Sequence, residues 1–474
     1  MRIGQTSFIT FVSNFLSSGA GFVGTIIFAR LLGADILGQY YLLLSIVAWL
    51  ALAGTLGFES AITKRLSEGE DRGAYKVAGG LCIAALTAMI VLALLLGEDV
   101  VQQLFGVRRI DFLILLLIVG VIGSYVDAIL QGVHLVHIYA GLRPVRRVVR
   151  TLVQVGGILL SFGIVALVFG YAAGGVVIIL IGLYVVGGPY SLPTREHFQS
   201  LYDYARFAWL GGMESKTFNQ ADILILGVFV SDSLVGVYGI TWNLANFLII
   251  FSNAIRSSLF PELSKLSADK SLAQVSSLLE DSLAYTGLFT IPGLVGGALL
   301  SDRLLGVYGP EFVDGSEVLW LLIGAVLVYG YQRQIINVLN AIDRPDESFK
   351  INSILILSNL VLNFVLIREY GIFGAAGATM TSVLFSFGFG YVLLNKHIDV
   401  TVPVDRIGVQ IAAALGMGLV IVSMEHLVEP ILSTTNNAIT TTMLVILGAA
   451  VYFALLWGLS ADFRRVVREN VPVF

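Results

Sequence analysis

Long apolar segments separated by short polar ones recur along the whole 474-residue chain. A helix needs roughly 17 to 25 mostly apolar residues to cross the hydrocarbon core of a bilayer, and the segments are long enough. The pattern predicts fourteen membrane-spanning helices, so we expect an all-α polytopic membrane protein. The predicted spans cover residues 6–32, 36–60, 77–97, 112–136, 148–169, 171–190, 207–230, 234–258, 279–301, 317–340, 351–367, 372–394, 405–427 and 438–459.

Cationic residues in the short loops predict the orientation of these spans, because Lys and Arg are enriched on the cytoplasmic side. With the N-terminus inside the cell, 21 of the 28 Lys and Arg residues fall in cytoplasmic segments and 5 in outer segments. The cytoplasmic set includes the four arginines of the stretch 143–150, next to the start of the span predicted at 148–169. We expect a multi-pass protein of the cell membrane with both termini in the cytoplasm.

Short motifs recur in the same order about 200 residues apart, which indicates an internal repeat. The pairs are DILGQY (35–40) with SLVGVY (233–238), KRLSE (64–68) with PELSK (261–265), and GLRP (141–144) with IDRP (342–345). Each copy of the repeat would hold six spans. After an even number of spans the chain returns to the same side of the membrane, so both copies have the same orientation, as in transporters with parallel repeats. We predict two six-helix lobes, at residues 1–192 and 193–395, and an appendage at 396–474 that holds the last two spans.

Composition agrees with a membrane protein and narrows the possible functions. The chain is 57% hydrophobic and 13% charged, with a mean hydropathy of +0.88, whereas a soluble domain carries about 25% charged residues. Cys82 is the only cysteine, which excludes disulfides and thiol metal clusters. His134 and His137 lack an obvious third ligand, so we expect no metal and no cofactor. We also expect no catalytic residues and no nucleic-acid partner.

The stretch MESKTFNQAD (213–222) places charged residues inside an otherwise apolar span. A charge in the middle of a membrane helix costs roughly 2.5–3.5 kcal/mol, so it normally faces a cavity or a partner. Regular helical spacing puts Lys216, Asn219 and Gln220 on one face. Glu214 and Asp222 lie on a different face, so Glu214 does not pair with Lys216 along the helix. A structural ion pair with another helix is the alternative interpretation of this stretch.

Other predicted spans carry polar residues that suit sugars and anions. Amides can hydrogen-bond sugar hydroxyls while an aromatic ring covers the C–H faces, although hydrogen bonds between helices explain the same residues. The span 234–258 holds Trp242, Asn243, Asn246, Asn253 and Arg256. Further candidate polar positions are Arg30 at the end of the first span, Asp127 in 112–136, and Arg333 and Asn337 in 317–340.

Four segments resemble the polysaccharide flippases, the Wzx-like branch of the multidrug/oligosaccharidyl-lipid/polysaccharide exporter superfamily. They are FARLLGADILGQYYLL (28–43), GFESAITKRLSE (57–68), NQADILILGVFVSDSLVGVYGI (219–240) and IRSSLFPELSKL (255–266). The resemblance covers nearly the whole chain. It implies a two-lobed transporter that moves a sugar or oligosaccharide linked to a polyprenyl or dolichyl phosphate or diphosphate by alternating access. Such a protein serves the synthesis of surface polysaccharide or glycoprotein glycans, as a monomer near the glycosyltransferases of its pathway.

The resemblance also implies cationic residues in a central cavity, and it assigns roles by placement. We expect Lys216, Arg333, Arg256 and Arg30 to bind the phosphate. The expected sugar-binding residues are Asn219, Gln220, Trp242, Asn243, Asn246, Asn253 and Asn337, and the candidates for ion or proton coupling are Glu214, Asp222 and Asp127.

Two other functions remain open at the level of sequence. A cation-coupled multidrug antiporter of the same superfamily would place a membrane carboxylate at its coupling site, and Asp127 is the candidate. An integral-membrane glycan polymerase or transferase would normally hold acids or histidines on a large outer loop. No such loop is predicted, and the internal repeat is unexpected for that class.

Overall fold

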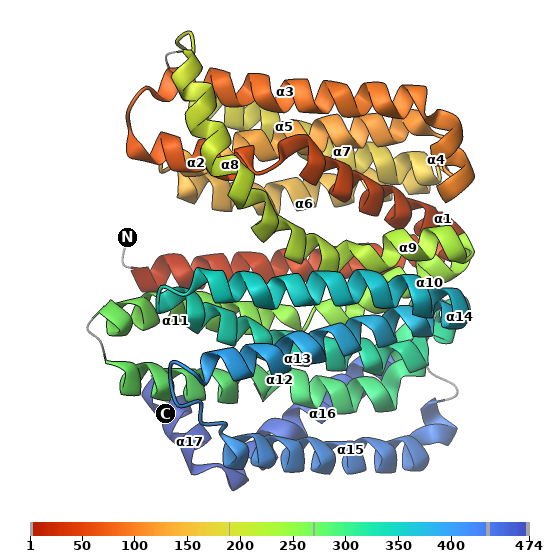
Figure 1. Ribbon diagram of the computed structural model, residues 1–474. Coiled ribbons are helices and arrows are strands. Elements are labelled where there is room, and N and C mark those ends of the chain that lie inside the picture. Colours follow the sequence, from red (N-terminus) through yellow and green to blue (C-terminus); the bar gives the residue numbers. More distant parts are fainter. Residues whose placement is uncertain (1–2, 189, 269–270, 433–436, 471–474) are drawn as a thin grey trace. The chain divides into compact units, whose positions relative to one another are not determined.

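The computed structural model describes residues 3–188, 190–268, 271–432 and 437–470 (Figure 1). Helices account for almost all of these residues, and no strand occurs among them. The helices form two compact units, residues 1–236 and 237–474, which we call unit 1 and unit 2. The all-α class predicted from the sequence is confirmed.

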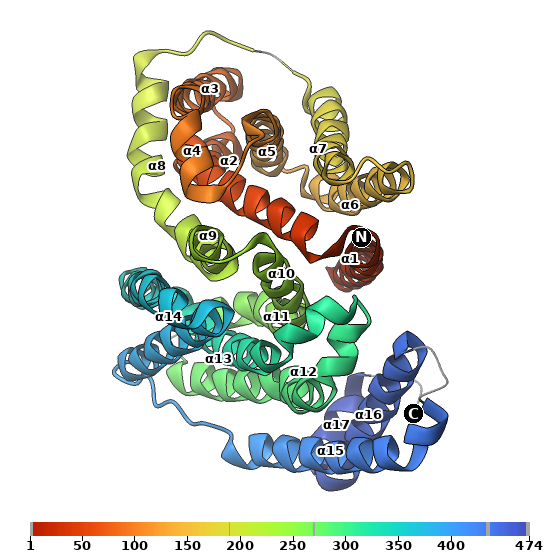
Figure 2. The same ribbon diagram turned by 90° about the vertical axis from the view of Figure 1, so that its right-hand side faces the viewer.

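Unit 1 is built around α5, which lies between α3 and α7 (Figure 2). Apolar residues of α2, α3, α5 and α8 form its main core, with Ile62, Leu66, Leu117 and Leu201 fully buried. The elements of unit 1 are α1 (Ile3–Thr55), α2 (Phe58–Glu68), α3 (Arg72–Leu96), α4 (Glu98–Phe105), α5 (Ile110–Gly132), α6 (Val136–Leu159), α7 (Ile164–Val186), α8 (Arg195–Lys216), the π-helix η1 (Thr217–Ala221), α9 (Asp222–Phe229) and the first residues of α10 (Asp232–Asn246).

Gly33 interrupts α1, which would otherwise be one helix of 53 residues. Its φ of 78° and ψ of 173° lie outside the helical region, and glycine adopts such angles without steric penalty. An unbroken helix of this length would measure about 80 Å, far more than a bilayer core requires. The break falls between the predicted spans 6–32 and 36–60, as the sequence pattern indicates.

The predicted span at 148–169 is displaced, because helix α6 covers Val136–Leu159 instead. The sequence analysis assigned arginines 143, 146 and 147 to a cytoplasmic loop, whereas the structure places them inside α6. Arginine is a good helix former, and a helix can hold a polar face if that face packs against other helices. The error came from treating charge as a sign of a loop.

Unit 2 has α12, α13 and α14 as its tightly packed centre, with α15 and α16 packed on α12. Leu279, Leu339, Ile351 and Leu394 are buried in one of its apolar cores. The remaining elements of the chain are α11 (Ile249–Ala268), α12 (Leu272–Gly306), the 3-10 helix η2 (Pro310–Gly315), α13 (Ser316–Ala341), α14 (Pro345–Leu394), α15 (Val404–Leu432), α16 (Asn437–Leu459) and α17 (Ala461–Asn470).

A break also divides α14, whose 50 residues bend at Gly371 with a φ of 54° and a ψ of −130°. This position lies between the predicted spans 351–367 and 372–394. Two buried asparagines of α14 form hydrogen bonds within this element. Asn363 Nδ2 donates to Asn359 Oδ1 at 3.0 Å, and Asn359 Nδ2 donates to Thr379 Oγ1 at 3.1 Å. The last of these bonds joins the two halves of α14 across the break.

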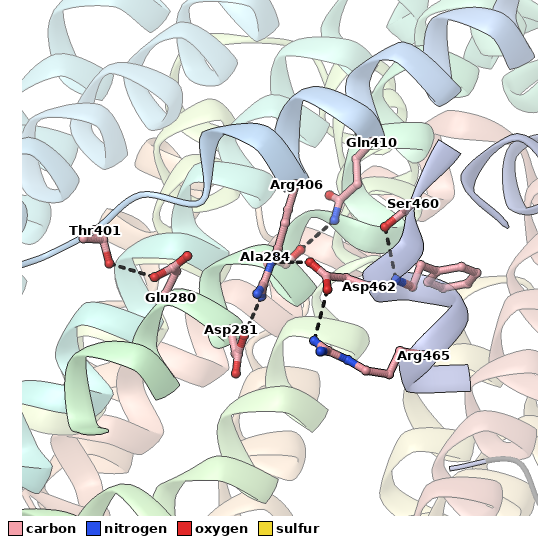
Figure 3. A network of polar contacts seen from close by, with 10 residues as sticks. Glu280, Asp281, Ala284, Thr401, Arg406, Gln410, Ser460, Asp462 and Arg465 are labelled. Atoms are coloured by element: carbon pink, nitrogen blue, oxygen red, sulfur yellow. Dashed lines mark hydrogen bonds and ion pairs between the residues drawn. The ribbon is translucent and has the colours of Figure 1, made fainter. Parts of the chain in front are cut away.

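Charged residues tie the C-terminal helices of unit 2 together (Figure 3). Arg406 of α15 contacts two carboxylates, with Nη1 2.5 Å from Asp281 Oδ1 of α12 and Nε 3.3 Å from Asp462 Oδ2 of α17. Arg465 Nη2 lies 3.0 Å from the other oxygen of Asp462. Gln410 Nε2 donates to Ala284 O at 2.8 Å. We call the residues Arg406, Asp281, Asp462 and Arg465 the C-terminal ion-pair network.

Nine of the described helices are long and apolar enough to cross a membrane, and the bent pair α10 and α11 would make a tenth. In this set α1 and α14 each count once, although Gly33 and Gly371 break them. Helices α6 and α8 are not in the set, and both carry several charged residues. The protein is therefore a multi-pass membrane protein, while the count of fourteen stays a prediction.

Candidate functional site

A π-helical turn interrupts the element that carries Lys216. Helix α8 ends at Lys216, η1 covers Thr217–Ala221, and α9 begins at Asp222. A π-helical turn holds an extra residue compared with an α-helix, and such turns are frequent at functional sites. The side chains after η1 are therefore rotated relative to those before it. The regular spacing assumed from the sequence does not hold between Lys216 and Asp222.

Lys216 is half-buried and forms no hydrogen bond or ion pair with the residues that the structure describes. Glu59 of α2 is the acid that acts on it electrostatically. Next to Lys216, Asn219 Nδ2 donates to the carbonyl four residues earlier at 2.8 Å. The carbonyl of Gln220 accepts a hydrogen bond from Ser45 Oγ of α1 at 2.7 Å. The fold thus fixes η1 against α1 and leaves the ammonium of Lys216 without a neutralising contact inside the described part.

The carboxylates named from the sequence occupy different surroundings in unit 1. Glu214 and Asp222 are buried, with 2% and 4% of their surfaces exposed. Asp127 of α5 is partly buried, and its Oδ2 accepts a hydrogen bond from Arg146 Nη2 at 3.2 Å. Arg30 lies on α1 with an exposed side chain. Asp127 is therefore a partner of a cation rather than an isolated membrane acid.

In unit 2, the candidate cations lie on α11 and α13. Arg333 Nη1 donates to Tyr329 OH at 3.4 Å, and its guanidinium lies 5.6 Å from the centre of the Tyr329 ring. Asn337 is buried, and its Nδ2 donates to Arg256 O at 3.5 Å. The structure therefore brings Asn337 next to the backbone of Arg256, while Arg333 stacks on an aromatic ring of its own helix.

The candidate sugar-binding residues of α10 and α11 differ in accessibility. Trp242 is buried, with 5% of its surface exposed. Asn243 and Asn253 are exposed, and Asn246 is half-buried. The accessible members of this set are therefore the amides, and the tryptophan belongs to the packed interior of unit 2.

Helix α6 carries a set of polar residues that the sequence analysis did not recognise as a face. Arg143, Arg146, Arg147, Arg150 and Gln154 follow a spacing of three and four residues, so they lie on one side of the helix. Helix α6 packs against α7, α1 and α5 in unit 1 (Figure 2). The spacing itself could have revealed the face, because residues in a loop need not follow a helical period.

Two glycines at equivalent positions of the repeat motifs make a reciprocal backbone contact inside unit 1. A side chain on Gly38 would collide with the carbonyl oxygen of Asp232, and one on Gly236 would collide with the carbonyl oxygen of Ala34. Each partner stands four residues before the glycine of its own motif. Gln39 Nε2 also donates to Asp232 Oδ2 at 3.0 Å. The segments DILGQY and SLVGVY thus pack on each other in a symmetric manner.

The chain is similar in sequence to a known protein family and to two proteins of Haloferax volcanii. The family model described as "Polysaccharide biosynthesis protein" matches residues 3–267. The chain is 28% identical over 473 residues to "Probable flippase AglR" of Haloferax volcanii, covering 99% of this chain and 98% of that protein. It is also 28% identical over 455 residues to "Probable low-salt glycan biosynthesis flippase Agl15" of the same organism, covering 95% of each.

A solved structure has the same fold. "Lipid II flippase MurJ, inward closed conformation" superposes with a TM-score of 0.79 over 97% of this chain and 100% of that chain. The two sequences are 18% identical, so the likeness concerns the fold alone.

Proposed function

Because this chain belongs to the polysaccharide biosynthesis protein family, we propose that it is a flippase for a lipid-linked glycan. Its substrate is a sugar or oligosaccharide on a polyprenyl or dolichyl phosphate or diphosphate. It acts in the cell membrane with both termini in the cytoplasm, and it supplies surface polysaccharide or glycoprotein glycan synthesis. The relatives in Haloferax volcanii carry the word flippase in their names and match this chain over nearly its full length. The chain has no catalytic role in this proposal.

The half-buried Lys216 beside the π-helical turn gives the main structural support for this function. A fixed positive charge in a membrane helix is costly unless something neutralises it, and no described residue does so within ion-pair distance. A phosphate group on a lipid supplies the missing negative charge. The lipid tail stays in the bilayer while the headgroup crosses in a hydrated path. Cations such as Lys216 and Arg333 lower the electrostatic barrier along this path.

We assign the four cations and the polar amides to different parts of one substrate. Lys216, Arg333, Arg256 and Arg30 bind the phosphate. Exposed or half-buried amides bind the glycan, namely Asn219, Gln220, Asn243, Asn246 and Asn253. Buried Asn337 and Trp242 shape the surroundings of these groups in the state described.

The proposed topology has fourteen spans in two six-helix lobes, 1–192 and 193–395, with 396–474 as an appendage. The breaks at Gly33 and Gly371 support this count, because each divides a helix that is too long for one span. The reciprocal contact of Gly38 and Gly236 supports a repeat relating the two motifs. Alternating access follows if the lobes rock about such close glycine contacts, which let backbones approach without intervening side chains.

Coupling to an ion or proton would use a carboxylate, and Glu214, Asp222 and Asp127 are the candidates. The antiporter alternative needs Asp127 as its coupling acid. The contact with Arg146 at 3.2 Å instead favours a role of Asp127 in neutralising one arginine of α6. We therefore give Glu214 and Asp222 precedence as coupling residues.

The test is translocation of a fluorescent dolichyl-diphosphate-linked sugar in liposomes that contain the purified protein. We expect Lys216→Ala and Arg333→Ala each to reduce translocation about tenfold or more, because each removes a charge-assisted contact to phosphate. Lys64→Ala is a matched control, since Lys64 pairs with Glu68 at 3.3 Å on the exposed side of α2. Wild-type rates in both the Lys216→Ala and the Arg333→Ala variant would refute the phosphate-binding role. Coupled export of a drug cation without any movement of the glycolipid would identify an antiporter instead.

A further inference from the structure

A line of polar contacts along α12 leads from the C-terminal ion-pair network into the interior of unit 2. Arg406 and Gln410 are one turn apart on α15, so they lie on the same face of that helix. Arg406 pairs with Asp281 of α12, and Gln410 Nε2 donates to Ala284 O at 2.8 Å, three residues further along α12 (Figure 3). The carboxylate is partly exposed, whereas Ala284 is buried. We call these contacts the α12–α15 seam.

Gly287, three residues beyond Ala284, lies next to two polar atoms from other helices. A Cβ on Gly287 would lie 2.7 Å from each of Gln410 Oε1, Tyr331 OH of α13 and Ile291 Cδ1. The two oxygens are therefore no more than twice that distance apart. Because glycine has no side chain, it lets both oxygens approach the backbone of α12 at this place.

Two buried polar atoms around Gly287 have no hydrogen-bond partner in the part of the chain that the structure describes, namely Gln410 Oε1 and Tyr452 OH of α16. Gln410 is 5% exposed and Tyr452 is 0% exposed. Tyr452 belongs to one apolar cluster with Ile291, and Tyr331 acts on it electrostatically, so the three polar side chains gather around Gly287. A buried polar atom without a partner destabilises a fold, and native proteins rarely leave one.

The chemistry of these three groups suits a water molecule. An amide oxygen such as Gln410 Oε1 only accepts hydrogen bonds, whereas a tyrosine hydroxyl both donates and accepts. The three groups are uncharged, which disfavours a phosphate or a metal cation as their ligand. Polar atoms that point at one place and do not bond directly are often bridged by water, and a buried water typically forms about three hydrogen bonds.

We infer that an ordered water molecule binds beside Gly287 and joins α13, α15 and α16. The water donates to Gln410 Oε1 and accepts from Tyr452 OH, and Tyr331 OH supplies its third hydrogen bond. This water fixes α15 and α16 on α12 and α13 from within, while the C-terminal ion-pair network fixes them at the more exposed end of the α12–α15 seam. The site belongs to unit 2 and does not depend on the proposed function.

Radiolytic footprinting of the full-length protein in nanodiscs tests for this water directly. X-rays produce hydroxyl radicals from water in place, so a tyrosine beside a bound water is oxidised even where bulk solvent does not reach it. Tyr40 is the matched control, because it is 2% exposed and its hydroxyl accepts hydrogen bonds from Arg150 and Gln154. We expect mass spectrometry to show Tyr452 oxidised about tenfold faster than Tyr40. Equal rates at the two tyrosines would overturn the proposal.

Gly287→Ala places a methyl group at the proposed water site, and Gly296→Ala is its control on the same helix. A Cβ on Gly296 would lie 3.7 Å from Met417 Cε, which is an ordinary van der Waals distance. We expect Gly287→Ala to lower the oxidation rate of Tyr452 to that of Tyr40, and Gly296→Ala to leave it unchanged. A loss in both variants, or in neither, would contradict a water beside Gly287.

The thermal transition of Tyr452→Phe is a second test, in which no bulkier side chain has to be tolerated. Phenylalanine keeps the shape of the ring and removes one hydrogen bond to the water, so we expect the melting temperature to fall by about 1–2 °C. At a dry site the same change would remove an unpaired hydroxyl, and the resulting rise in melting temperature would refute the water.

The wild-type melting temperature in sodium chloride and in choline chloride of equal ionic strength separates water from a cation. We expect the two values to agree, because the three groups are uncharged. A higher value in sodium chloride that Gly287→Ala abolishes would mean that the site binds sodium, and it would overturn the proposal.

Discussion

The arginines of α6 in unit 1 and those of the C-terminal ion-pair network in unit 2 show two different surroundings of the same residue type. Arg406 contacts two carboxylates from two other helices, Asp281 and Asp462 (Figure 3). On α6, Arg146 pairs with Asp127 at 3.2 Å, while Arg150 donates to the neutral hydroxyl of Tyr40 at 2.7 Å and lies over the Tyr171 ring. An ion pair between two helices neutralises the charge and joins the helices, whereas a hydrogen bond to a neutral hydroxyl positions a guanidinium and leaves its charge in place.

The comparison also shows why Arg406 can sit at the end of α15 without a ligand. Its side chain is 31% exposed, so water shares in its solvation. The ion pairs connect α12, α15 and α17, and α17 is also held by an aromatic contact of Phe463 with Phe453 of α16. Loss of that link should loosen the C-terminal helices and leave the chemistry of unit 1 unaffected.

The largest expected effect on stability comes from Arg406→Ala, which leaves Asp281 and Asp462 close together without their cation. We expect the free energy of unfolding to fall by about 1 kcal/mol, because the pair is partly solvated. Thermal denaturation in detergent measures this change. The double variant Arg406→Asp with Asp281→Arg should regain part of the stability. A destabilised Arg406→Ala protein that also loses dolichyl phosphate binding would break the comparison.

Asp127→Asn should change ligand affinity, and this variant is expected to bind dolichyl phosphate more tightly than the wild type. This change removes the carboxylate that pairs with Arg146 and leaves that guanidinium without its anion. Affinity for dolichyl phosphate should rise about threefold at low ionic strength, and the gain should shrink in high salt as charges are screened. Binding titrations at two salt concentrations measure both effects. Complete loss of transport in this variant would instead support Asp127 as a coupling acid.

The smallest effect is expected from Arg465→Gln in α17. Arg465 and Asp462 are both well exposed, and exposed ion pairs contribute about 0.2–1 kcal/mol. The melting temperature and the translocation rate should remain close to those of the wild type. A loss of translocation comparable with that of Lys216→Ala would show that positive charge anywhere in the protein matters, and the distinction between the two regions would fail.

Much of the helical architecture could be predicted from the sequence, because its cause is local. The glycine breaks at Gly33 and Gly371 fall between predicted spans, since a change from apolar to polar residues and a glycine coincide there. The displaced span at 148–169 shows the limit of this approach. Hydropathy treats an arginine as unfavourable wherever it lies, whereas α6 turns its arginines towards other helices.

The candidate site was predictable only in part. Lys216 was recognised because a lone cation in an apolar run is conspicuous. The π-helical turn after it was not, because one extra residue per turn depends on contacts such as Ser45 with the Gln220 carbonyl, which no local pattern records. Asp127 was named as a possible coupling acid, and its partner Arg146 was assigned to a cytoplasmic loop before the span predicted at 148–169.

The order of amino acids alone determined that this chain is a bundle of membrane helices, since a run of apolar side chains is unstable in water whatever its neighbours are. It also determined where cations enter apolar segments. Only the tertiary structure decided which of those cations meet a carboxylate and which do not. The ion pair of Arg406 with Asp281 and the hydrogen bond from Arg150 to Tyr40 each join residues more than 100 positions apart, and helix packing brings them within reach.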